Sequence, residues 1–227
     1  MPQIFHRSLN TIAVLSIYAG GLLAVGAGWA ATAFVRSSYA TGANNAYEQP
    51  VPFSHHHHVN ELGIDCRYCH TSVEESHFAG IPPTKTCMNC HSQIWVGAKM
   101  LEPVRESYRK NEGIVWKRVH QLGEFCYFNH SIHVAKGIGC VTCHGRIDQM
   151  PLVWQEKSLL MEWCLDCHRQ PEKYVRPREE VYNMTFSYRD IKDANGKSKY
   201  ASQLDLGREL VEKYQIKSKM SCSACHR

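Results

Sequence analysis

Ten of the 11 cysteines form five Cys-x-x-Cys pairs, and a histidine follows each pair directly. The paired cysteines are Cys66 and Cys69, Cys87 and Cys90, Cys140 and Cys143, Cys164 and Cys167, and Cys222 and Cys225. The histidines that follow them are His70, His91, His144, His168 and His226. This spacing lets two thiols form thioethers with the vinyl groups of one haem, and it holds the histidine beneath the iron as proximal ligand. We therefore expect five covalently bound haem c groups.

Zinc clips and disulfides also use paired cysteines, but neither needs a histidine after every pair. With 14 histidines in 227 residues, five such coincidences would arise about once in a million sequences of this composition. The remaining cysteine, Cys126, lacks a partner at haem spacing. We expect it to be a buried free thiol, and we expect none of the cysteines in a disulfide.

An internal repeat indicates which histidines could bind iron on the distal side. Residues 53–58 (FSHHHH) match residues 128–133 (FNHSIH) at an offset of 75 residues, and Cys-x-x-Cys-His motifs follow both blocks. The chain therefore reads as two successive two-haem modules with a fifth haem appended. The distal ligands that the repeat singles out are His55, His58, His130 and His133. Within the four-histidine run, His56 and His57 are expected to be spare.

Other side chains could complete the distal ligand set. His77 and His120 are the next candidates, against the alternative of a surface or propionate-binding role. Methionine could replace one histidine and raise that haem's potential. Met150 and Met161 lie between the third and fourth motifs, although core packing is the simpler role for both.

The block that precedes the first and third motifs resembles that of class III multihaem cytochromes. In those proteins the first histidine of the block caps the haem that follows, and the second histidine reaches a different haem. This resemblance implies that His55 pairs with His70 and that His130 pairs with His144. It also implies that His58 and His133 bind neighbouring haems.

The N-terminal segment is predicted to cross a membrane once. No charged residue lies between Arg7 and Arg36. Residues 11–35 are mostly apolar and would form a helix roughly 38 Å long at about 1.5 Å per residue, which exceeds the roughly 30 Å hydrocarbon layer. We interpret this segment as an uncleaved signal anchor in the cytoplasmic membrane. Haem c is attached outside the cytoplasm, so the N-terminus would be cytoplasmic and residues from about 40 onward periplasmic.

The anchor carries small residues at every fourth position, which would let another transmembrane helix approach closely. These residues are Ser16, Gly20, Ala24, Gly28 and Thr32. An integral-membrane partner is therefore expected.

The rest of the chain is short for five haems, so a core of side chains alone would be thin. We expect a mainly α structure with much irregular chain, little β-sheet and the haems as its core. Helices are expected after His91, interrupted by Pro103, and over residues 204–217. The expected divisions are an anchor (1–39), a first two-haem module (40–115), a second two-haem module (116–170) and a C-terminal segment with the fifth haem (171–227). Within the last of these, residues 170–220 should pack along a partner or across the haem face.

The composition excludes several classes of function. The hydrophobic content of 44 % argues against disorder, and the formal charge of +5 could suggest nucleic acid as a partner. Ten haem propionates, against about five charges from ferric porphyrins, would bring the oxidised protein close to neutrality. The basic excess is therefore a counter-charge for haem, and nucleic acid is not expected.

The motifs favour an electron carrier over an enzyme. Catalysis at haem iron needs an open coordination position, whereas distal histidines are in excess here. The sequence has no Cys-x-x-Cys-Lys variant, phosphate loop, zinc-protease motif or nucleophile elbow. No catalytic residue is predicted.

Three longer strings, with the anchor and the five motifs, resemble one family. They are residues 116–120 (WKRVH), 127–133 (YFNHSIH) and 161–169 (MEWCLDCHR). The family is the membrane-anchored pentahaem cytochrome c subunit of alternative complex III, and the resemblance is weakest over residues 170–220. It implies a complex that oxidises quinol and passes electrons to a periplasmic acceptor or an oxidase. The implied partners are integral-membrane quinol-binding subunits, an iron–sulfur subunit and a monohaem cytochrome c. The alternative is a quinol dehydrogenase of the tetrahaem-anchor type that feeds periplasmic reductases.

Overall fold

The computed structural model describes residues 4–226, and within that range the chain is helical and irregular, without strands. Isolated β-bridges are its only extended pairings there. The α-helices are α1 (Ser8–Arg36), α2 (Ser38–Thr41), α3 (Cys66–Cys69), α4 (Thr84–His91), α5 (Glu102–Lys110), α6 (His130–Ala135), α7 (Cys140–His144), α8 (Met161–Arg169), α9 (Gln203–Lys213) and α10 (Cys222–Cys225). A π-helix, η1 (His56–Glu61), and 3₁₀ turns η2 (Lys99–Leu101), η3 (Ile147–Gln149), η4 (Pro171–Lys173), η5 (Arg178–Glu180) and η6 (Tyr188–Asp190) complete the set. The expected mainly α, irregular architecture is confirmed.

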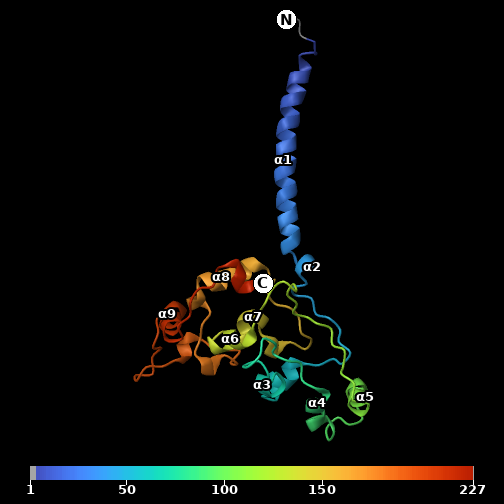
Figure 1. The fold of residues 1–227 in the computed structure, drawn as a ribbon, viewed down its shortest axis with the longest axis vertical. Helices are drawn as coiled ribbons and strands as arrows, with labels where there is room; N and C mark the ends of the chain where they lie inside the picture. Colours follow the sequence, from blue (N-terminus) through green and yellow to red (C-terminus); the bar gives the residue numbers. More distant parts are fainter. Residues whose placement is uncertain (1–3, 227) are drawn as a thin grey trace.

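Helix α1 stands apart from the rest of the molecule (Figure 1). It has 29 residues, none of them buried, and is about 44 Å long at 1.5 Å per residue. Among the described residues it is the one helix long and apolar enough to cross a membrane. A helix that is apolar on all sides and buried against nothing in its own chain requires an apolar environment from elsewhere.

The end of α1 is tied to the helix that carries the fourth motif. Arg36 donates from Nε to Oε1 of Glu162 at 2.9 Å and from Nη2 to Oε2 at 2.8 Å. Gln155, which is buried, donates to the carbonyl of Thr41 at 3.2 Å. Figure 1 accordingly shows α8 and the C-terminus near the foot of α1, with α3, α4 and α5 at the far end of the molecule.

Two small apolar clusters form the side-chain core. One contains Val175, Leu206, Leu210 and Tyr214, and the other contains Val51, Leu101 and Val104. The first lies at α9 and the second beside α5, on opposite sides of the motif helices (Figure 1). The motif cysteines themselves are only partly buried or exposed. The predicted thin core is therefore found, and the second motif borders it, because Cys87 and Met88 pack against the cluster of Val51, Leu101 and Val104.

The C-terminal stretch packs against the second module of this chain. Lys136 donates from Nζ to the carbonyl of Tyr214 at 2.6 Å, and the Arg176 amide donates to the carbonyl of Gly137 at 2.9 Å. The helix expected over 204–217 is present as α9. The helix expected after His91 instead begins at Glu102, because Pro103 lies in its first turn, where proline is favourable and does not interrupt a helix.

Substituting Gly207 tests the packing of α9. A Cβ there would meet the carbonyl oxygen of Glu172 at 1.9 Å, so Gly207→Ala must push α9 away from η4. We expect a cost of about 1–3 kcal/mol from overpacking, which outweighs the helix-propensity gain of up to about 1 kcal/mol. Thermal melts of the holo-protein followed by circular dichroism should show a lower Tm. Gly113→Ala, which faces open space, is the control, and equal melts for the two variants would contradict the packing.

Removing the cofactors should have a larger effect. Protein made without haem-attachment machinery is expected to show no cooperative thermal transition, because two small clusters cannot offset the entropy of ordering so much irregular chain. A sharp melt of that apo-protein, measured by circular dichroism, would refute a fold organised around haem.

Candidate haem-binding sites

Each motif lies on one short helical turn, in α3, α4, α7, α8 and α10. Residues three apart on a helix point to the same side, so both cysteines of a motif share a face. In α3 the turn is started by Asp65, whose Oδ1 accepts the amide of Arg67 at 2.8 Å. The helical turn thus presents two thiols and the following histidine to one side of the chain.

Four histidines of the repeat face four motif histidines across a gap. The ring centroids of His55 and His70 are 6.5 Å apart, with planes at 2°. The equivalent pair in the second module, His130 and His144, is 6.4 Å apart at 11°. The other two pairs are His58 with His91, at 6.3 Å and 68°, and His133 with His168, at 6.2 Å and 66°. Both modules therefore repeat one nearly parallel and one steeply crossed pair.

This spacing fits a metal ion between the rings. With metal–nitrogen bonds of about 2.0 Å and nitrogens about 1.1 Å from the ring centres, two imidazoles on one metal have centroids about 6.2 Å apart. Direct ring stacking would bring them closer. The residues present therefore suit four six-coordinate haem irons.

Backbone carbonyls orient most of the eight facing imidazoles. His70 reaches the carbonyl of Gly80 from Nδ1 at 2.7 Å. Gly80 adopts a φ of +84°, a conformation that side-chain-bearing residues rarely adopt. Because a carbonyl only accepts, Nδ1 carries the proton and Nε2 keeps the lone pair that binds a metal. The same contact is made by His58 to Ser54 at 2.8 Å, His130 to His77 at 2.8 Å and His133 to Asn129 at 2.7 Å.

One phenylalanine in each block fixes the direction of both distal rings. Phe53 lies edge-on to His55 at 4.9 Å and stacks on His58 at 4.4 Å. Phe128 makes the equivalent contacts in the second module, at 4.8 and 4.5 Å. No role was predicted for these two phenylalanines, although their equivalent places in the repeat were a usable signal.

Burial keeps the facing groups neutral. Desolvation is the main cause that lowers the pKa of His55 to about 4 and that of His144 to about 3. It also raises the pKa of Cys140 and of Cys143 to about 12. Neutral imidazole is the form that binds a metal, so the site holds its histidines ready for ligation.

The five motifs are neighbours in a definite order. At each junction, burial and a nearby cysteine of another motif raise the pKa of a thiol, and for Cys164 the lone Cys126 contributes more than the motif cysteine Cys225. The neighbours are Cys69 with Cys87, Cys140 with Cys66, Cys143 with Cys167, and Cys164 with Cys225. The motifs therefore lie in the order second, first, third, fourth, fifth, from the far end of the molecule toward the foot of α1 (Figure 1).

The fifth motif is held by the second module. The Tyr127 amide donates to the carbonyl of Cys225 at 2.8 Å, and His226 donates from Nδ1 to the carbonyl of Phe125 at 3.1 Å. The ring of His226 contacts Phe125 at 5.7 Å. Cys126, expected to be a buried free thiol, is free but only partly buried, and it forms a short extended pairing with His226.

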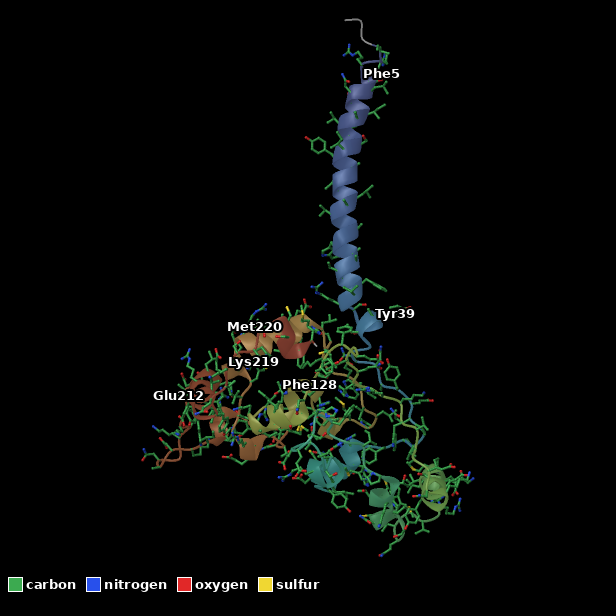
Figure 2. The ribbon with its side chains drawn as sticks, viewed as in Figure 1. Phe5, Tyr39, Phe128, Glu212, Lys219 and Met220 are labelled. Carbon is green, nitrogen blue, oxygen red and sulfur yellow. The ribbon has the colours of Figure 1, made fainter. Side chains whose placement is uncertain are left out.

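The two further histidine candidates occupy different positions. The ring of His77 contacts Phe78 at 4.9 Å. The ring of His120 lies 4.3 Å from that of His144, which is too close for a metal ion between them. Of the two methionines, Met150 is fully buried and Met161 is exposed. Figure 2 shows Phe128 in the centre of the side-chain network, with Lys219 and Met220 on the C-terminal side near the foot of α1.

Comparison with known proteins supports a multihaem cytochrome c. Residues 126–227 match the family described as cytochrome c7 and related cytochrome c. Over 99 residues the chain is 35 % identical to the multihaem cytochrome c subunit of menaquinone reductase from Nitratidesulfovibrio vulgaris. That alignment covers 43 % of this chain and 46 % of the relative, so the match spans about half of the relative's length. The similarity implies covalently bound c-type haem.

The imidazole pairs can be tested within the four-histidine run. His55→Ala removes the ring that faces His70 and should convert one haem per chain from low-spin to high-spin in the electron paramagnetic resonance (EPR) spectrum. His56→Ala, one position along, should leave every haem low-spin. Two identical spectra would contradict the pairing of His55 with His70.

Proposed function

We propose that this chain carries five covalently bound haem c groups and relays electrons as a subunit of a quinol-oxidising membrane complex of the alternative complex III type. The observation that carries the proposal is the set of four imidazole pairs spaced for a metal ion, repeated in both modules. Each pair takes both ligands of its iron from this chain. The haems supply one-electron chemistry.

The protein around the irons suits electron transfer. At the four imidazole pairs, two imidazoles from this chain would leave no coordination position for a substrate, and carbonyls and phenylalanines hold most of these rings in place. Iron ligands that move little between the ferric and ferrous states keep the reorganisation energy of electron transfer small. This chain therefore acts as a carrier, and the quinol site belongs to other subunits.

The order of the motifs gives the proposed relay two distinct ends, and the oxidation of quinol would set its direction. The fourth and fifth motifs lie near the foot of α1, and the second lies at the far end (Figure 1). With α1 as the single anchor in the cytoplasmic membrane, its N-terminus cytoplasmic, electrons from quinol enter at the fourth and fifth haems. They leave at the second haem, on the periplasmic side, toward a soluble acceptor or an oxidase.

A second direction is favoured by one observation. The relative found by comparison is named as a subunit of a menaquinone reductase, and such a complex would run the same row of haems toward the membrane. The tetrahaem-anchor type of quinol dehydrogenase agrees less well, because this chain has five motifs.

Gentle solubilisation and purification distinguish these assignments. The chain should co-purify with an iron–sulfur protein, a monohaem cytochrome and polytopic subunits, and added menaquinol should reduce its haems. Recovery with a periplasmic reductase alone would contradict the proposal. Haems that menaquinol leaves oxidised, but that pass electrons to menaquinone once a chemical reductant has reduced them, would establish the reverse direction.

The number of haems is tested separately. Intact mass and the pyridine haemochrome spectrum should give five haems per chain, and the double variant Cys222→Ala and Cys225→Ala should give four. Cys126→Ala is the matched control and should keep five, because Cys126 has no role in attachment. A count of five in the double variant would rule out the fifth site.

A further inference from the structure

The third motif differs from its neighbours in what holds its histidine. The Nδ1 atoms of His58, His70, His130 and His133 all meet backbone carbonyls. The Nδ1 of His144 instead lies 3.2 Å from Nε2 of His120. The two rings are crossed at 72°, with centroids 4.3 Å apart. A side chain therefore contacts the motif histidine of the third site, whereas the motif histidines His70, His91 and His226 contact backbone carbonyls.

We propose that His120 is a positioning residue of the third site, which accepts the Nδ1 proton of His144 and thereby lowers the reduction potential of the haem bound there. This inference rests on the proposed function, because it requires a haem iron on Nε2 of His144.

The proton positions follow from the contact. When Nε2 of His144 binds a metal, its Nδ1 carries a hydrogen and can only donate. Nε2 of His120 must then be the acceptor, so the single ring proton of His120 lies on its Nδ1. Both rings are neutral, and the direction of the hydrogen bond is fixed by ligation of the iron.

The electronic consequence follows from the identity of the acceptor. A hydrogen bond from the distant nitrogen of a ligating histidine makes that ligand more basic. An imidazole nitrogen is a stronger base than an amide carbonyl, so His144 acquires more imidazolate character than the carbonyl-bound ligands. A more electron-rich ligand stabilises ferric over ferrous iron. The reduction potential of the third haem would thus be lower than it would be with a carbonyl contact.

The fold holds His120 in this place. The side chain of Gln49 makes two hydrogen bonds to the backbone of Lys117. Its Oε1 accepts from the Lys117 amide at 2.9 Å, and its Nε2 donates to the Lys117 carbonyl at 3.0 Å. Arg118 then donates from Nε to the carbonyl of His120 at 3.2 Å. The segment that brings His120 to the third motif is therefore fastened to the chain before the first motif, and it connects the two modules at the middle of the row.

The test uses the full-length holo-protein and a redox titration followed by EPR. His120→Phe keeps a ring but removes the acceptor, and we expect one haem to titrate at a higher midpoint potential while all haems stay low-spin. His120→Gln offers an amide oxygen and should restore the potential in part. His56→Phe, a substitution of the same kind at a spare histidine, should leave all potentials unchanged. The haem that shifts should be the one whose low-spin signal is lost in His130→Ala.

The outcomes separate this inference from the proposed function. Unchanged potentials in His120→Phe would overturn the positioning role. A new high-spin signal in that variant would also overturn it, because it would make His120 an iron ligand. If the His120→Phe variant binds fewer haems, the midpoint potential of the third haem in His120→Gln becomes the test. A potential equal to that of the unaltered chain would contradict a role for the imidazole acceptor. A haem count below five, or high-spin haem at any of the four imidazole pairs of the unaltered protein, would instead count against the proposed function.

Discussion

A gap of about 6 Å between facing imidazoles is the constraint on which the rest of the structure depends. To keep four such gaps open, the chain holds rings apart instead of packing them together. Carbonyls and one phenylalanine per block supply the orientation that close packing gives in an ordinary core. The conventional apolar clusters are small and lie at the two sides of the molecule.

The repeat explains how a short chain produces a continuous row. Within each module the first histidine of the block faces the first motif that follows, and the second faces the next motif. A single short block thereby holds two neighbouring sites at a fixed separation. Joining the modules at the first and third motifs places the second motif at the far end, so the spatial order differs from the order in the sequence.

The row also has two unlike ends. Arg36 and Glu162 connect the apolar helix to the fourth motif, whereas α4 and α5 lie away from it (Figure 1). A relay with one end at a membrane and the other in solution needs this asymmetry. At its middle, between the modules, the motif histidine His144 contacts the side chain of His120, whereas His70, His91 and His226 contact backbone carbonyls.

The sequence by itself determined the features that arise within a few residues. Two cysteines and a histidine on one helical turn are a local pattern, as is the mostly apolar stretch of residues 11–35, so both could be read directly. The repeat also identified His55, His58, His130 and His133 as a set. The resemblance to class III multihaem cytochromes also implied the pairs His55 with His70 and His130 with His144. Tertiary structure decided which motif histidines His58 and His133 face, the order of the motifs, the exposure of Cys126 and the contact of His120 with His144. The physical reason is that these contacts join segments far apart in the chain through single hydrogen bonds and ring contacts, and such contacts leave no periodic pattern in the sequence.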